Sequence, residues 1–373
     1  MSDYVGISYR ERFMKMDKRL VLNIDPTPEN GRNSEGSFLR APNGDILFAY
    51  SRYRTSESGD DSPCDIALRR SSDEGDTWSE PTIITKSAFF GVSNVMSVSG
   101  LMLKDGRLCF FMLIKENDGS STIGRAVSSD GFSFEVSRCA CNYLRNYYVI
   151  NNDRFVRLAD GRIAAPAAKH DVGLDVIDRN MKYGFDPAIA VVLISSDDGE
   201  SFSCMSPRVS LTIRQNGGTG MQEPGIIEYP GYHRMWARTS AGYQYECYSF
   251  DGMRTFSQPE PSQFTSPCSP LGMWRLSDGT VYAVYNPIPR YNGRNHPEWY
   301  SDRTPLVIRK SSDGVNFGPL NYIEEDPARG YCYPAIFETK DGCLLCAYCR
   351  GNADDRGCLN RLGIMKITKS TIE

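Results

Sequence analysis

Residues 341–349 read DGCLLCAYC, a tight Asp-Gly turn followed by a strand-like apolar run. Five further copies of this pattern are spread along the chain: NGDILFAYSR from Asn43, DGRLCFFMLI from Asp105, DGRIAAPAA from Asp160, PGYHRMWAR from Pro230 and DGTVYAVYN from Asp278. An Asp-Gly or Asn-Gly turn that feeds a strand is a strong signal for a β-hairpin. The six copies therefore predict a repeated hairpin unit of about 60 residues.

A second pattern alternates with the first. SSDEGDTW covers residues 71–78, SSDDGESF covers residues 195–202, and shorter variants begin at Ser128, Ser249 and Ser311. Asp and Ser side chains close such turns by bonding nearby backbone amides, while Gly supplies the positive φ. We interpret the acidic residue of each box as a turn-forming residue rather than a catalyst.

Each unit therefore holds two hairpins, or four short strands, and long helical periodicity is missing. Radial repetition of four-stranded blades is the natural arrangement for six such units. The sequence predicts an all-β fold, a six-bladed β-propeller with four-stranded antiparallel blades, in a single domain over residues 1–373. The first unit predicts strands near residues 37–40, 45–51, 65–71 and 82–85. The last unit predicts strands near residues 333–337, 344–348 and 363–367, and residues 19–24 are expected to supply its fourth strand and close the ring.

The composition narrows the class of protein. A content of 40% hydrophobic residues in 373 rules out disorder for most of the chain. The net charge of −4 argues against a nucleic-acid coat or an anionic-membrane binder. The charged N-terminus lacks the apolar core of a secretory signal, so we expect a cytoplasmic location and free thiols. We expect no metal or cofactor, and the oligomeric state stays open.

The cysteines do not predict a zinc site. Cys343, Cys346 and Cys349 form the tightest of the groups among the 12 cysteines. On a strand, Cys343 and Cys349 share one face, whereas Cys346 points to the other. We therefore expect buried structural thiols.

Strand direction locates the site. In an antiparallel blade, the turns joining strands 1–2 and 3–4 lie at one end, and the start of strand 1 and the loop between strands 2 and 3 lie at the other. Polar residues gather at this second end, as a polar anionic ligand would require: Glu35, Arg52, Asp60, Asp61, Asn152, Arg154, His170, Glu223, Arg238, Arg303, Tyr333 and Arg350. Glu223 stands out, because a carboxylate directly before an inner strand faces the crowded axis, where burial without a purpose is costly.

The boxes of the form Ser-x-Asp-x-Gly-x-Thr-Trp, on a six-unit repeat, resemble the sialidase (neuraminidase) superfamily with its BNR, or Asp-box, repeats. The resemblance covers essentially the whole chain. It implies a glycoside hydrolase that cleaves a terminal acidic sugar, sialic acid or a similar one, with a Tyr nucleophile. The substrate carboxylate would repel an anionic nucleophile, and a neutral Tyr activated by a Glu base avoids that repulsion. The boxes also occur in proteins without this activity, so the function has to be inferred from the residues of the site.

The resemblance also implies roles for single residues. The segment QEPGIIEYPGYHRMWARTS looks like the family's segment with the base and a clamp arginine, which are Glu223 and Arg238 here. GYCYPAIF looks like the nucleophile segment and favours Tyr333. SDRTPLVIRKSSDG offers Arg303 as another clamp arginine, and SGDDSPCD resembles the loop with the acid/base. That residue is Asp60 or Asp61.

One stretch departs from the family. The first inner strand of the family opens with an Arg-Ile-Pro signature that supplies a clamp arginine, whereas NSEGSF places Glu35 there. We expect Glu35 to pair with an arginine or with a sugar hydroxyl, because an unpaired buried carboxylate would become neutral. Either an arginine compensates (Arg32, Arg52, Arg154 or Arg350), or the substrate differs. A glycosidase or polysaccharide lyase for another acidic sugar and a non-catalytic carbohydrate-binding propeller therefore stay open.

Overall fold

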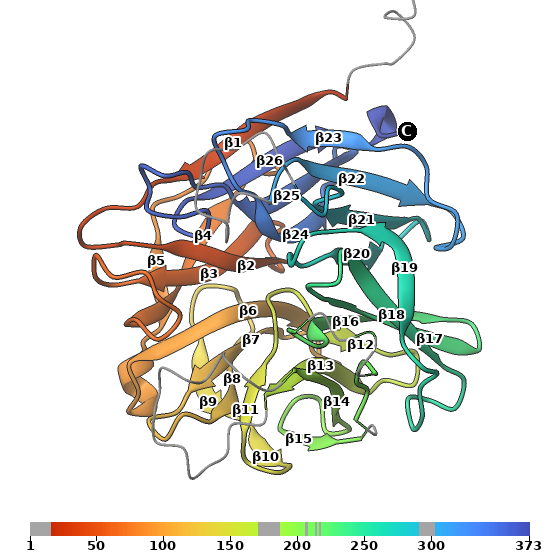
Figure 1. The fold of residues 1–373 in the computed structure, drawn as a ribbon. Helices are drawn as coiled ribbons and strands as arrows, with labels where there is room; N and C mark the ends of the chain where they lie inside the picture. The colour runs from red at the N-terminus through yellow and green to blue at the C-terminus, as the bar shows by residue number, and fades with distance from the viewer. Residues whose placement is uncertain (1–15, 171–186, 206–207, 213–214, 216–217, 291–302) are drawn as a thin grey trace, which may run out of the picture.

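The computed structural model describes residues 16–170, 187–205, 208–212, 215, 218–290 and 303–373. The fold is all-β, and its sheets are arranged around a common centre in a propeller-like way (Figure 1). Helical structure in these ranges is limited to short 3-10 turns, η1 (Ser87–Phe90) and η3 (Lys369–Thr371). Neither has the length or the apolar character that crossing a membrane requires.

The first two units form one continuous sheet. Strand order is β2-β3-β4-β6-β7-β8-β9, with β5 paired to β4, and a single parallel bridge between Cys64 and Asn94 joins the two halves. The strands of the first half match the predicted ranges closely: β2 (Asn33–Arg40), β3 (Ile46–Tyr53), β4 (Cys64–Ser71) and β5 (Thr82–Thr85). The second half consists of β6 (Asn94–Met102), β7 (Leu108–Lys115), β8 (Ser121–Ser128) and β9 (Glu135–Arg138).

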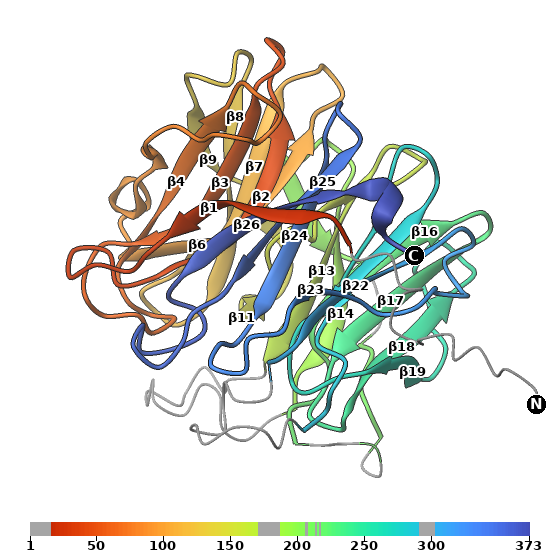
Figure 2. The ribbon, with the colours of Figure 1, turned by 90° about the horizontal axis from the view of Figure 1, so that it is seen from above.

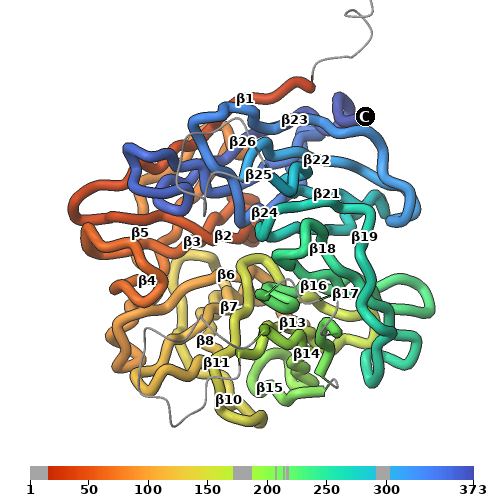
Figure 3. Tube along the Cα trace, viewed as in Figure 1, coloured from red at the N-terminus to blue at the C-terminus, as the bar shows by residue number. Residues whose placement is uncertain are grey.

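Three further sheets follow, and the trace passes through them in sequence order around the centre (Figure 3). One has the order β10-β15-β14-β13-β11, with β12 on β13, and the next two are consecutive meanders, β16 to β19 and β20 to β23. The strands of the first are β10 (Ala140–Asn142), β11 (Tyr147–Val149), β12 (Val156–Arg157), β13 (Ile163–His170), β14 (Ile189–Ser195) and β15 (Ser201–Cys204). The meanders are β16 (Gln222–Tyr229), β17 (Tyr232–Arg238), β18 (Tyr243–Ser249) and β19 (Glu260–Thr265), then β20 (Gly272–Arg275), β21 (Val281–Tyr285), β22 (Leu306–Ser311) and β23 (Asn321–Glu324).

The remaining sheet joins distant parts of the sequence. Its order is β1-β26-β25-β24, with β1 (Lys18–Ile24), β26 (Leu362–Thr368), β25 (Cys343–Cys349) and β24 (Cys332–Glu338). β1 runs antiparallel to β26 and lies beside it in Figure 2. Ile24 is opposite Leu362 and packs with Phe38 of β2 and Leu345 of β25. This contact places the first described strand in the core shared by neighbouring sheets.

The Asp boxes form turns at the ends of strands. β4, β8, β14, β18 and β22 each end at the box serine. In the first box, Ser71 Oγ donates to Asp73 Oδ1 at 2.8 Å, and the Thr77 amide donates to the same oxygen at 2.9 Å. The serine-to-aspartate bond recurs at 2.8–3.0 Å in the other four boxes. The interpretation of the box aspartates as turn-forming residues is confirmed.

Strand register places these boxes away from the start of the inner strands. Glu35 lies near the beginning of β2, which ends at Arg40. Ile46 of β3 pairs with both Arg40 and Ser71, so the box that follows Ser71 lies at the Arg40 end. In this unit the box and Glu35 are therefore at opposite ends of the strands, as strand direction predicts.

Candidate active site

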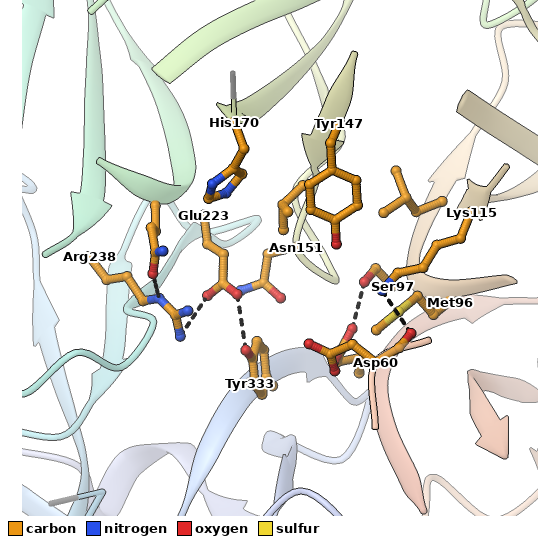
Figure 4. A pocket seen from close by; sticks show the side chains of 14 residues that line it. Asp60, Met96, Ser97, Lys115, Tyr147, Asn151, His170, Glu223, Arg238 and Tyr333 are labelled. Atoms are coloured by element: carbon orange, nitrogen blue, oxygen red, sulfur yellow. Dashed lines mark hydrogen bonds and ion pairs between the residues drawn. The ribbon is translucent and has the colours of Figure 1, made fainter. Parts of the chain in front are cut away.

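A cavity of about 140 Å³ lies where several inner strands begin (Figure 4). Its wall combines carboxylates, cations, amides and two tyrosines, with few apolar groups. The lining residues are Glu35, Asp60, Met96, Ser97, Leu113, Lys115, Tyr147, Val149, Asn151, His170, Gln222, Glu223, Arg238 and Tyr333. This wall suits a small polar ligand.

Four of these residues occupy one recurring backbone position. Glu35, Ser97, Glu223 and Tyr333 have φ values of 56°, 58°, 46° and 56°, and each lies at a register shift in the first strand of its unit. Asp153 has the same conformation, with φ 56°. The left-handed region is unfavourable for side chains other than Gly, Asn and Asp, and such strain gathers at functional sites. A repeated bulge therefore supplies four of the side chains that line the cavity.

Next to the bulge at Glu35, the backbone of Gly36 lies directly against a side chain of β3. A Cβ atom on Gly36 would lie 2.3 Å from the Phe48 ring, so only glycine fits there. The residue that follows Glu35 is thus packed directly against an aromatic ring of β3.

On one side of the cavity, a phenol, a carboxylate and a guanidinium are in contact. The Tyr333 hydroxyl donates to Glu223 Oε1 at 3.0 Å, and Arg238 Nη1 lies 3.2 Å from Glu223 Oε2. Burial, reinforced by the Glu223 charge and opposed by Arg238 and Arg303, raises the pKa of Tyr333 well above its ordinary value. The phenol is therefore neutral in the free site, and Glu223 is placed to accept its proton.

Several buried polar atoms on this side make no hydrogen bond. Among the described residues, no hydrogen-bond partner is found for Glu223 Oε2, Arg238 Nη1 or Asn151 Nδ2, all of which are buried. The contact of Arg238 with Glu223 is an ion pair by distance only. Buried polar atoms are nearly always hydrogen-bonded, so these three are available to a ligand.

The opposite side is built around Arg32, which is 1% exposed. Its Nη2 donates to Glu35 Oε1 and its Nη1 to Asp60 Oδ1, both at 2.6 Å. Ser97 Oγ donates to Glu35 Oε2 at 2.5 Å. The expectation that Glu35 pairs with an arginine is thus confirmed, and Arg32 is the arginine that pairs with it.

The two carboxylates that share Arg32 differ in acidity. Burial raises the pKa of Glu35 to about 6, although the Arg32 charge works against this. Desolvation also disfavours the ionised form of Asp60, but Arg32 and Lys115 outweigh it and hold the Asp60 pKa well below its ordinary value. Asp60 is therefore an anion at neutral pH, whereas Glu35 takes up a proton in mildly acidic solution.

The loop between β3 and β4 holds Asp60 and Asp61 in different environments. Lys115 Nζ donates to the backbone carbonyl of Asp60 at 2.7 Å, and Asn94 Nδ2 donates to the same oxygen at 3.0 Å. Asp60 lines the cavity, whereas the side chain of Asp61 is 54% exposed and lies 3.5 Å from Lys115. The structure therefore places Asp60 at the site and Asp61 at its rim.

His170, at the end of β13, completes the upper wall in Figure 4. Its ring lies 5.8 Å from that of Tyr147, and both residues line the cavity. Burial, with a contribution from the Arg238 charge, lowers the pKa of His170 to about 4. The imidazole is thus neutral at physiological pH and adds no charge to the wall.

Two residues expected at the site, Arg303 and Asn152, lie next to the cavity without lining it. Arg303 Nη1 donates to Cys332 Sγ at 3.1 Å, and its guanidinium carbon is 5.7 Å from the centre of the Tyr333 ring. Asn152 Nδ2 donates to the backbone carbonyl of Gly36 at 2.9 Å. Arg303 thus adds positive charge behind the phenol, and Asn152 anchors the strand that carries Glu35.

Three expected arginines lie elsewhere. Arg154 donates to the Leu271 carbonyl at 2.6 Å and lines a separate cavity of about 410 Å³. Arg350 pairs with Glu324 at 3.2 Å, and Arg52 pairs across β2 and β3 with Asn33. None of the three is among the residues that line the cavity, so the expectation that they lie at the site is not met.

The sequence analysis missed Ser97, Tyr147 and Asn151. One signal could have found Ser97. Residues in the left-handed position precede the glycine of the next turn by eight or nine residues, and Ser97 stands at that distance from Gly106. Tyr147 and Asn151 follow no repeat, because they belong to an irregular segment around β11.

Within the ranges that the structure describes, no group of three or more His, Cys, Asp or Glu side chains is arranged to hold a metal ion. The 12 cysteines are free thiols, and eight are buried. The cavity wall offers the Tyr333 and Tyr147 phenols, three carboxyl groups, the His170 imidazole and the neighbouring cations.

Comparison with known proteins agrees with this architecture. Residues 108–346, more than half of the chain, match the BNR repeat-like domain family. No curated protein matches the sequence.

Solved structures give the same fold at low identity. A protein of unknown function from Dyadobacter fermentans has a TM-score of 0.67 at 17% identity, covering 94% of this chain and 99% of that one. A Hadza microbial sialidase has a TM-score of 0.70 at 14% identity, covering 92% and 66%. A Trypanosoma rangeli sialidase, bound to 2,3-difluorosialic acid as a covalent intermediate, has a TM-score of 0.64 at 12% identity, covering 91% and 54%. This chain thus spans between about half and two thirds of the two sialidase chains, and the likeness shows the fold alone. With the Asp boxes in place, the chain belongs to the BNR repeat-like domain family.

Proposed function

We propose that this protein is a retaining glycosidase of the sialidase type that cleaves a terminal acidic sugar with Tyr333 as the nucleophile. The observation that carries the proposal is the 3.0 Å hydrogen bond from the Tyr333 hydroxyl to Glu223 Oε1, inside a polar cavity. A nucleophile in hydrogen-bond contact with a base is the arrangement that covalent catalysis requires.

The neighbouring cations suit an acidic sugar. Arg238 Nη1 is buried and makes no hydrogen bond, and its one charged neighbour is Glu223 Oε2 at 3.2 Å, so we infer that it binds a carboxylate of the substrate. Arg303 adds positive charge behind the Tyr333 ring. A neutral phenol approaches an anionic sugar without the repulsion that a carboxylate nucleophile would meet.

The reaction proceeds in two displacements. Tyr333 forms a bond to the anomeric carbon and passes its proton to Glu223, while the bond to the leaving oxygen breaks and a carboxylic acid of the opposite wall protonates that oxygen. Water then attacks the anomeric carbon and gives its proton to the same carboxylate. The bond to Tyr333 breaks, and Glu223 returns the proton to the phenolate. Two inversions give net retention.

The known structures lend support by analogy. The Trypanosoma rangeli sialidase bound to 2,3-difluorosialic acid is described as a covalent intermediate. We further propose that the sheets correspond to six blades, with β1 as the closing strand of the last one. The pairing of β1 with β26 and the division of the long first sheet at a single bridge support this count.

A second candidate function rests on Glu35. Its carboxylate stands where the family has a clamp arginine, and Arg32 is already shared between Glu35 and Asp60. This wall suits sugar hydroxyls better than a carboxylate. A glycosidase for a different acidic sugar, bound through Arg238 alone, is therefore the alternative.

The Tyr333→Phe variant tests the proposal. Its turnover of a 4-methylumbelliferyl sialoside should fall by about a thousandfold or more, because the phenyl ring offers no nucleophile. Tyr331→Phe is the matched control, since Tyr331 is buried two residues away and does not line the cavity. Mass spectrometry after reaction with a 2,3-difluorosialoside should locate a covalent adduct on Tyr333. Normal turnover by Tyr333→Phe would contradict the mechanism, and cleavage of other acidic glycosides alone would favour the second candidate.

A further inference from the structure

The cavity that Arg154 lines is larger than the candidate active site. Its volume is about 410 Å³, within the range that small-molecule sites occupy. Residues of β6, β12, β16, β20 and β24 contribute to its wall, and we call it the back cavity. It shares no lining residue with the candidate active site. The two cavities are therefore separate, although several of the same strands pass along both.

The back cavity lies toward the other ends of these strands. On β16, Glu223 at the start of the strand lines the active site, whereas Glu228 near its end lines the back cavity. On β24 the corresponding residues are Tyr333 and Ile336. Beyond Glu228, β16 continues into its hairpin turn with β17. The back cavity thus lies nearer the hairpin turns than the active site does.

Arg154 is a buried cation in the wall of the back cavity. The residue is 3% exposed, and its Nη2 donates to the backbone carbonyl of Leu271 at 2.6 Å. Its Nε is buried and makes no hydrogen bond. Within the ranges that the structure describes, Arg154 is in no ion pair. Because a buried guanidinium is costly without an acceptor, this group is suited to bind an anionic oxygen.

The acidic groups of the same wall are held by other donors. Ser37 Oγ donates to Asp153 Oδ1 at 2.5 Å, and Trp274 Nε1 donates to Asp153 Oδ2 at 2.6 Å. The amide of Ala159 donates to Glu228 Oε2 at 2.7 Å. Neither carboxylate is in an ion pair with an arginine of the described residues. The back cavity therefore keeps a cation with which a ligand can pair.

Two further arginines belong to this wall. Arg157 Nη2 lies 2.5 Å from Asp198 Oδ1, so its charge is already paired. Arg275 is exposed, and its guanidinium carbon lies 4.6 Å from the centre of the Tyr229 ring. No carboxylate of the described part of the chain pairs with Arg275. This residue thus adds positive charge at the mouth of the back cavity.

The rest of the wall is mostly apolar. It includes the side chains of Phe155, Ile226, Trp236, Met273, Trp274 and Ile336. The indole N–H of Trp236 donates to the Leu271 carbonyl at 2.8 Å, and that of Trp274 donates to Asp153, so the two rings offer carbon surface to a ligand. An apolar wall with a buried cation suits an organic acid with an apolar body, whereas the hydroxyls of a sugar would find few partners.

We propose that the back cavity binds a small carboxylic acid with an aromatic body. Its carboxylate pairs with Arg154, and its ring packs against Trp274. An aromatic ring is favoured over an aliphatic chain because aromatic pairs stabilise each other beyond the area that they bury. The ligand differs from the terminal acidic sugar of the active site, and the proposal does not depend on the glycosidase function.

The indole N–H signals of the full chain test the location. The chain has four tryptophans, and Trp→Phe variants assign their signals in 1H–15N spectra. The probe is 2-naphthoate, and 2-naphthamide is the uncharged analogue of similar shape. Titration with 2-naphthoate should shift the signals of Trp236 and Trp274 and leave that of Trp78, which does not line the back cavity, unchanged. The Kd of 2-naphthamide should be at least about tenfold higher, because it forms no charge-assisted pair with Arg154.

Three variants test the residues. In Arg154→Gln the Kd of 2-naphthoate should rise at least about tenfold, while that of 2-naphthamide should stay within about threefold. Arg107→Gln, which removes an exposed arginine outside the back cavity, is the matched control and should bind both probes as wild type does. Leu101→Trp keeps the cation but fills space in the cavity, so it should weaken both probes at least about tenfold. The indole spectrum also shows whether each variant is folded.

Three results with wild type would overturn the proposal, and they decide it even if Arg154→Gln does not fold. Equal affinity for the two probes would mean that no cation takes part. No shift of the Trp236 and Trp274 signals by 2-naphthoate would mean that no such acid enters the cavity. A shift of these signals by N-acetylneuraminate at lower concentrations than by 2-naphthoate would make the back cavity a sugar site. The glycosidase function is tested separately through Tyr333.

Discussion

At the scale of single residues, Glu35 and Glu223 show how one backbone position serves two chemistries. Both have a left-handed backbone and both are buried. Glu223 contacts a neutral phenol and an arginine, whereas Glu35 contacts Ser97 and an arginine that also holds Asp60. The neighbours, and not the strand position, set what each carboxyl group can do.

Ser97 should lower the pKa of Glu35. The Ser97 hydroxyl donates to the ionised carboxylate and thereby lowers the Glu35 pKa. Removing that bond in Ser97→Ala should raise the pKa of Glu35, which NMR titration of the carboxyl carbon measures. Ser97→Thr, which keeps a hydroxyl, is the control, and an unchanged Glu35 pKa in Ser97→Ala would contradict this role of the bond.

His170 should make the fold sensitive to acid. Its pKa is lowered from 6.5 in the unfolded chain to about 4 in the folded protein, because burial disfavours the imidazolium. The unfolded state therefore binds the proton first, and stability falls as pH drops from about 6.5 to about 4. The loss should approach about 3 kcal/mol at the lower limit.

Urea unfolding measures this effect. The difference in unfolding free energy between wild type and His170→Gln should change between pH 7.5 and pH 4.5, in favour of the variant at the lower pH. Parallel pH dependence of the two proteins would show that the imidazole is not desolvated as the structure has it.

At the scale of strands and turns, the box turns are separable from the site. Asp73 accepts bonds from Ser71 and from the amide and hydroxyl of Thr77. Asp73→Ala should lower the unfolding free energy by about 1–2 kcal/mol. Turnover per folded molecule should not change, because the box lies at the strand ends remote from Glu35. Glu135→Ala, at an exposed strand position, is the control for a surface charge. A large loss of activity without a loss of stability would contradict this separation.

Local chemistry explains which elements the sequence could predict. Asp-Gly turns and Ser-Asp boxes are closed by their own side chains, so the strands beside them were found within a few residues, as with β4 (Cys64–Ser71) and β24 (Cys332–Glu338). The left-handed bulges were not predicted, since the residues that adopt the left-handed backbone are not glycines. The partner of Glu35 could not be singled out either, because four arginines were compatible with the sequence and only the fold brings Arg32 to the carboxylate.

At the scale of the whole molecule, the pairing of β1 with β26 should carry much of the stability. Ile24 is 6% exposed and packs among residues of β2, β25 and β26, whereas Leu20 on the same strand is 41% exposed. Ile24→Ala should lower the unfolding free energy by about 2–4 kcal/mol, and Leu20→Ala by less than about 1 kcal/mol. Chemical denaturation measures both. Equal effects would mean that β1 is attached only by its backbone.

The same pairing has a consequence for biogenesis. β1 is synthesised early, but its partner residues 362–368 leave the ribosome only after more than 330 further residues have been made. During that time β1 presents an unpaired edge, to which a neighbouring nascent chain can add a strand. The final sheet has to form by a contact between distant sequence positions, which is slow compared with hairpin formation. Its assembly therefore awaits translation of β26, and chaperone protection of β1 until then would favour the correct product.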